Sequence, residues 1–258
     1  MTYTEDQFLE IAQAHKEWLD RRKTLTERLL MREYRHESSR ILAAQGLVRR
    51  LQTLSRCIDG VYTLLPPEET EPQRSSIDEA AIYLQAFVIN VYGSLDNLAR
   101  LWVREYGLTK PGGGAVPQQH IGLGAGCKLV RGSLSQPLQD HLVAADGWFR
   151  YLENYRHALA HRIPLYIPPK TLNETEADDH ERLEQQAYAA LKAGDFDTFD
   201  EFMGAQSQLG SFQPMMMHSY GGADGDGWPV AFHGQIICDF ATVVRIGEMM
   251  VAELDTLP

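Results

Sequence analysis

Apolar residues recur at helical spacing through most of this chain, and no comparable series alternates in the way that β-strands do. A helix with one apolar face must bury that face against a neighbour, and short breaks between long helices favour antiparallel packing. We therefore predict an all-α fold, an antiparallel helical bundle. The predicted bundle helices span residues 4–35, 41–65, 76–106, 135–163 and 232–255.

Proline, glycine and a capping pattern set the expected ends of these helices. The second helix must stop at Pro66 and Pro67, because proline lacks the amide hydrogen and clashes with the preceding turn. Ser76 and Glu79 have capping-box spacing, which indicates the start of the third helix. Pro164 ends the helix that begins near residue 135.

Two segments fall outside this pattern. Residues 107–133 contain eight glycines and predict a long loop, a possible flap beside a site; no GxGxxG or GxxxxGK[ST] phosphate motif is present. Residues 171–230 form an acidic insertion, with helices expected at 174–193 and 195–203. A short β-hairpin is expected around the glycine-rich turn 221–227. We treat residues 1–258 as a single domain that contains this insertion.

Charge is unevenly distributed along the chain. The formal net charge is −11, and residues 171–258 hold three basic and 16 acidic side chains, whereas residues 111–170 hold six basic and three acidic ones. An anion site is therefore expected before residue 171. The first helix has a basic edge that either contacts a phosphate backbone or, as we favour, is a solvated edge with i,i+4 pairs such as Glu17 with Arg21. This edge comprises Arg21, Arg28, Arg32 and Arg35.

The sequence also bears on the compartment. No uncharged run is apolar enough for a membrane span, and the first residues lack the basic and apolar regions of a secretory signal. Cys57, Cys127 and Cys238 are odd in number and far apart, which argues against a disulfide framework or a CxxC motif. We expect a cytoplasmic protein with reduced thiols that does not bind a membrane.

The segment 155–162, YRHALAHR, concentrates basic and imidazole side chains near the end of a predicted helix. In one interpretation Arg156 points into a helix interface and forms a structural pair with Asp96 of the neighbouring helix. In a second, Glu153, His157 and His161 recur at i, i+4 and i+8 and bind a divalent metal, although HExxH and a distant ligand are missing. In a third, a guanidinium and an imidazole act on a phosphodiester.

The third interpretation agrees with a resemblance to a known protein family. Arg156, His157 and His161 match the pattern R-[N/H/D]-x-x-x-H, which resembles the signature of the HEPN superfamily. The run YRHALAHRIPLYIPP and the earlier helix YGSLDNLARLW are similar to a bacterial branch of that group. The resemblance covers residues 76–165 and implies an antiparallel helical bundle.

The resemblance implies a homodimer in which two copies of the motif form one composite RNA site, with no metal or cofactor. Arg156 would then position the phosphate, His161 would act as acid or base, His157 would orient or assist, and Asp96 would hold Arg156 or His161. The expected activity is endoribonuclease cleavage by attack of the ribose 2′-hydroxyl. The alternative is a non-catalytic module that binds a nucleotide, RNA or a protein partner, as many members of the superfamily do, with the motif in a structural role.

Overall fold

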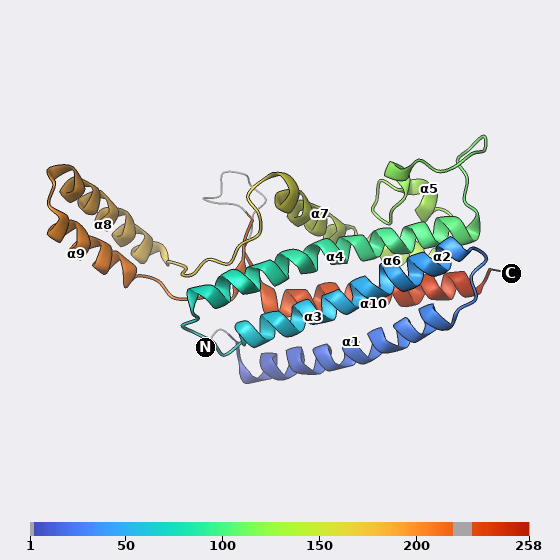
Figure 1. Ribbon diagram of the computed structural model, residues 1–258, viewed down its shortest axis with the longest axis horizontal. Helices are drawn as coiled ribbons and strands as arrows, with labels where there is room; N and C mark the ends of the chain where they lie inside the picture. The colour runs from blue at the N-terminus through green and yellow to red at the C-terminus, as the bar shows by residue number, and fades with distance from the viewer. Residues whose placement is uncertain (1–2, 219–228, 258) are drawn as a thin grey trace.

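The computed structural model describes residues 3–218 and 229–257 (Figure 1). Long helices dominate this part of the chain, which confirms the all-α prediction. The helices are α1 (Glu5–Met31), α2 (Glu37–Ile41), the π-helix η1 (Leu42–Leu47), α3 (Val48–Leu64), α4 (Arg74–Tyr106), the 3₁₀ turn η2 (Gln118–His120), α5 (Lys128–Arg131), α6 (Gln136–Ala144), α7 (Asp146–His161), α8 (Glu174–Ala193), α9 (Phe196–Ser207) and α10 (Phe232–Asp255).

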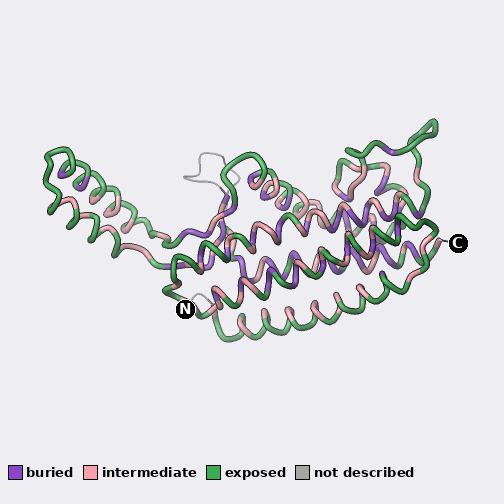
Figure 2. The backbone as a smooth tube through the Cα atoms, in the orientation of Figure 1, coloured by how far each residue is buried: buried purple, intermediate pink, exposed green. Residues whose placement is uncertain are grey.

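Four long helices, α1, α3, α4 and α10, form the bundle. Figure 1 shows that α1, α3 and α4 alternate in direction, as their short connections require, whereas α10 runs in the same direction as α1. Buried residues follow the inner sides of these helices (Figure 2). Helix α4 lies at the centre, because α3, α10 and α7 all pack against it. The largest fully buried side chains include Trp102, Phe87 and Phe240.

The long helices mostly begin and end where the sequence predicts. Helix α10 spans the predicted residues. Helix α4 ends at Tyr106 and is capped by Gly107, whose positive φ of 72° suits a residue without Cβ. The predicted capping box at Ser76 is wrong: α4 begins at Arg74, and its N-cap Gln73 makes no side-chain hydrogen bond. Tertiary packing of Ile77 and Ala80 therefore outweighs the local signal.

The helix predicted at 135–163 is two helices. Helix α6 ends at Ala144, α7 begins at Asp146, and Ala145 between them leaves the helical conformation with ψ of 1°. The Asp146 carboxylate in the first turn of α7 pairs with Arg131, and an acidic side chain is favourable at a helix N-terminus. The ion pair thus coincides with a break that the apolar periodicity did not show.

The basic edge of α1 packs against α10. The guanidinium of Arg21 pairs with Glu248, and those of Arg28 and Arg32 both pair with Asp255. Arg32 also donates to the carbonyl oxygen of Leu254, where the negative end of the α10 dipole favours a cation. The predicted Glu17–Arg21 pair is present at 3.4 Å. The edge is therefore largely an interhelical contact, which neither interpretation of the sequence anticipated.

The acidic insertion forms a helical hairpin, α8 and α9, that projects beyond one end of the bundle (Figure 1). Gly194, with φ of 75°, ends α8 and confirms the predicted split. Strands β1 (Met215–Met216) and β2 (Val230–Ala231) pair antiparallel, as the sequence suggested. The predicted turn residues 221–227 lie outside the described residues.

The structure also bears on the predicted state of the cysteines and on the prediction that no segment spans a membrane. The thiols of Cys57, Cys127 and Cys238 are all free. Among the described helices, none has a stretch both long enough and apolar enough to cross a bilayer.

Candidate functional site

Helix α7, which carries the Arg156 to His161 segment, packs against α4 and is anchored on α10. The indole Nε1 of Trp148 donates a 2.8 Å hydrogen bond to Oδ1 of Asp239. Asp239 is 1% exposed and also accepts from Gln235. Burial raises the pKa of Asp239 to about 6, although these two hydrogen bonds favour the ionised form. The first turns of α7 are therefore held by a buried polar contact.

Arg156 lies at the interface between α7 and α4, half-buried, as its position near the apolar stripe predicted. Its guanidinium carbon is 4.3 Å from the centre of the Tyr92 ring, a cation–π contact. The predicted pairing with Asp96 is not formed: Asp96 accepts a 2.7 Å hydrogen bond from Nε of Arg100, one turn along α4. Within the described residues, Arg156 has no carboxylate partner.

The two histidines lie on the exposed side of the same helix. The ring centres of His157 and His161 are 6.2 Å apart, and His161 is the last residue of α7. His157 Nε2 is 3.8 Å from the Glu153 carboxylate, and both side chains are more than half exposed. His161 lies five positions after Arg156, so their side chains leave the helix about 140° apart. The structure brings the imidazoles together and directs Arg156 to a different side.

The metal interpretation lacks a ligand set in the described part of the chain. Glu153, His157 and His161 share a helix face, but no three His, Cys, Asp or Glu side chains there converge on one point. A structural zinc site takes four ligands and a catalytic site three. The geometry therefore offers at most the two neighbouring imidazoles.

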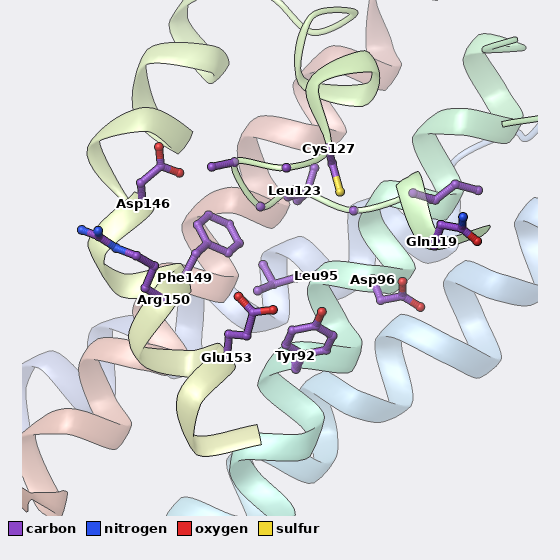
Figure 3. Close-up of a pocket in the computed structure, with 15 residues that line it drawn as sticks. Tyr92, Leu95, Asp96, Gln119, Leu123, Cys127, Asp146, Phe149, Arg150 and Glu153 are labelled. Atoms are coloured by element: carbon purple, nitrogen blue, oxygen red, sulfur yellow. The ribbon is translucent and has the colours of Figure 1, made fainter. Parts of the chain in front are cut away.

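A cavity of about 330 Å³ lies beside this segment, between α4, α7 and the glycine-rich loop (Figure 3). Tyr92 joins the two features, because its ring supports Arg156 and also lines the cavity. Residues 121–127 form the wall opposite α4. The loop predicted at 107–133 thus borders a cavity. The sequence of the loop contains no ligand-binding motif that marks this cavity. The position of the loop depends on contacts with other parts of the chain.

The lining of this cavity combines apolar and polar groups. Leu95 and Phe149 supply apolar surface, and in Figure 3 the Tyr92 hydroxyl and the Glu153 carboxylate point toward the open space, whereas Arg150 points away. Cys127 lies at the loop side, and burial raises the pKa of its thiol. Such a lining suits a planar ligand with hydrogen-bond donors on its edge better than a free phosphate.

Arg131 is the residue that positions the loop, and the sequence analysis did not single it out. Its Nε donates a 2.7 Å hydrogen bond to the carbonyl oxygen of Leu123, and Nη2 lies 2.6 Å from Oδ1 of Asp146. The guanidinium carbon is 5.5 Å from the centre of the Phe149 ring. One buried side chain thus joins the cavity loop to the start of α7. In the sequence, the only indication of this role is that a basic residue directly follows the apolar pair Leu129 and Val130.

Comparisons with known proteins give no further assignment. No protein-family model, curated protein or solved structure matches this chain. The HEPN resemblance therefore rests on the residues quoted above.

We predict that Arg131→Met lowers the free energy of unfolding by about 2–4 kcal/mol, because it leaves Asp146 and the Leu123 carbonyl without their buried donor. Amide hydrogen exchange in residues 121–127 should also become faster. Urea unfolding and exchange mass spectrometry measure the two effects. Arg150→Met, at an exposed side chain of the same cavity, serves as the control and should change stability by less than about 0.5 kcal/mol. Equal effects of the two substitutions would contradict the role assigned to Arg131.

The raised pKa of Asp239 predicts a specific pH dependence. Between the ordinary value of 3.8 and about 6, the folded protein keeps a proton that the unfolded chain releases, so rising pH lowers stability across this window. The loss should total about 3 kcal/mol. Asp239→Asn removes the titration. The difference in unfolding free energy between wild type and variant, measured by urea titration from pH 4 to pH 7, should show this slope; parallel profiles would exclude it.

Proposed function

We propose that this protein is a metal-independent endoribonuclease of the HEPN type, centred on Arg156 and His161. The resemblance of the segment 156–161 supports the proposal, as does its position at the exposed end of α7. The proposal places the chain in the cytoplasm, where RNA is available and thiols stay reduced.

The observation that carries the proposal is the environment of Arg156. A structural arginine at a helix interface is expected to bond to a carboxylate, yet Asp96 pairs with Arg100 instead. The guanidinium rests on the face of Tyr92, and this stacking leaves its N–H groups available to phosphate oxygens. The hairpin of α8 and α9 projects away from the bundle, and the side chains of His157 and His161 remain exposed.

The proposed reaction needs only a base, an acid and a group that stabilises charge. A histidine removes the proton of the ribose 2′-hydroxyl, the 2′ oxygen bonds to the adjacent phosphorus, and the bond from phosphorus to the 5′ oxygen breaks. A proton returns to the leaving 5′ oxygen, which gives a cyclic phosphate and a 5′-hydroxyl end. Arg156 stabilises the charge that develops on the phosphate, His161 acts as acid or base, and His157 assists.

Two copies of the motif suit this reaction better than one. Arg156 and His161 of one α7 leave the helix on different sides, so a single copy presents them to one phosphate poorly. We therefore include a homodimer in the proposal, in which the motif of a second chain completes the site. Asp96, which pairs with Arg100 and not with Arg156, is given no direct part in the reaction.

We predict that the wild type cleaves single-stranded RNA in the presence of EDTA and leaves cyclic phosphate ends. His161→Ala and Arg156→Ala should each lower the rate at least about a hundredfold, because each removes proton transfer or charge stabilisation. A gel assay with end-group analysis measures both. His36→Ala, an exposed histidine near the start of α2, is the control and should leave the rate unchanged. Cleavage that survives His161→Ala, or that requires a metal, would refute the proposal.

The cavity beside Tyr92 favours a second candidate, a non-catalytic nucleotide-binding module. Its aromatic and apolar walls suit the face of a base, and the Glu153 carboxylate can accept two parallel N–H groups from the edge of guanine. Adenine, cytosine and uracil each place an acceptor beside their donor at this edge. The second candidate therefore predicts guanosine as the preferred nucleoside.

This candidate is tested by calorimetric titration with guanosine and with inosine, which lacks the 2-amino group. Guanosine should bind at least about tenfold more tightly, and Glu153→Gln should remove this preference. His161→Ala should leave binding unchanged, and Glu174→Gln, on the distant α8, is the matched control. Equal binding of the two nucleosides, or none, would rule the candidate out without bearing on RNA cleavage.

A further inference from the structure

The hairpin of α8 and α9 is held away from its own bundle (Figure 1). Its two helices pack chiefly on each other. At its base, the backbone of Thr171 and Ser211 exchanges two hydrogen bonds, of 2.9 and 3.1 Å, and Lys170 donates to the carbonyl oxygen of Ser207. These contacts fix the direction in which the hairpin leaves the bundle.

The hairpin exposes apolar side chains that its two helices cannot cover. Phe196 is 65% exposed although it is one of the largest apolar residues of the segment. A pair of helices by itself buries little apolar surface, and grouped exposed apolar residues are typical of a contact site. The exposed large apolar residues of the two helices are Tyr188, Leu191, Phe196 and Met203.

The charge of the hairpin limits the kinds of surface to which it can bind. Residues 174–207 carry ten acidic and two basic side chains. On α8, Glu181, Glu184, Tyr188 and Leu191 fall on one helix face, since they follow the spacing i, i+3, i+7 and i+10. The complementary surface must therefore offer both cations and apolar area.

The same chain has such a surface between α3 and α4. A groove of about 570 Å³ is lined by Arg49 and Arg56 at two-turn spacing and has no carboxylate in its lining. Within the described residues neither arginine forms an ion pair. Ile82, which is 65% exposed, provides apolar surface. The remaining lining residues are Gln52, Thr53, Cys57, Tyr83 and Ala86.

We propose that the α8–α9 hairpin of one copy docks into the α3–α4 groove of a second copy. Its carboxylates meet Arg49 and Arg56, and its apolar residues cover Ile82. A second copy is the favoured occupant because the chain itself carries both complementary surfaces. Two such contacts related by a twofold axis close a dimer. This inference deepens the proposed function: the docking contact is the one that holds the two chains of the homodimer together. Neither surface includes Arg156 or His161, so loss of the contact and loss of RNA cleavage are measured separately.

The experiment measures the oligomeric state of full-length variants by analytical ultracentrifugation. Wild type should be a dimer that weakens as salt rises. The groove variant Arg49→Glu/Arg56→Glu and the hairpin variant Glu181→Arg/Glu184→Arg should each raise the dimer dissociation constant on the order of a hundredfold. An equimolar mixture of the two variants should associate again, because each reversed surface then meets an opposite charge.

The matched control is Lys16→Glu/Lys110→Glu, which changes the net charge as the groove variant does but at exposed sites elsewhere. It should remain a dimer, and circular dichroism should show native helix content for all variants. A monomeric wild type, or a dimer that persists in both reversed variants, would overturn the proposal. A mixture of the two variants that does not dimerise would also overturn the proposal. Docking of the hairpin on the groove requires that the mixture form a dimer.

Discussion

Burial of α4 on several sides is the constraint on which the rest of the structure depends. Its apolar residues pack against α3 and α10, and the side facing α7 carries Tyr92 and Asp96 at the edge of that core. Because a helix with this much buried surface cannot rotate or slide without exposing it, its polar edge has a fixed orientation. The cation–π contact of Arg156 and one wall of the cavity follow from that orientation.

The sequence predicted those parts of the fold that depend on periodicity and on strong breaking signals. Helix α10 and the ends at Gly107 and Gly194 followed from apolar spacing and from glycine chemistry. The break before Asp146 did not, because the residue that accompanies it, Arg131, lies in another helix and acts through space. Long-range pairs of this kind leave no local pattern in one chain.

In the candidate site, too, local features were predicted and long-range contacts were not. The half-buried position of Arg156 followed from helix geometry, whereas its neighbour was mispredicted, because Asp96 has a closer cation one turn away on its own helix. The sequence indicated that the glycine-rich loop could lie beside a site but not where that site is, since the cavity forms only where the loop returns to α4 and α7. The basic edge of α1 was also predicted only in part. In the sequence it resembles an anion-binding edge, but in the structure Glu248 and Asp255 largely neutralise it.

The projection of the acidic hairpin has a consequence for long-range electrostatics. Ten acidic and two basic side chains on a rod beyond one end of the molecule place most of the formal net charge of −11 at that end. A nearby polyanion is repelled from that end and turned toward the opposite one before any contact forms. At low ionic strength, where the screening length is greatest, the hairpin therefore biases the approach of charged molecules over distances that no side chain can reach.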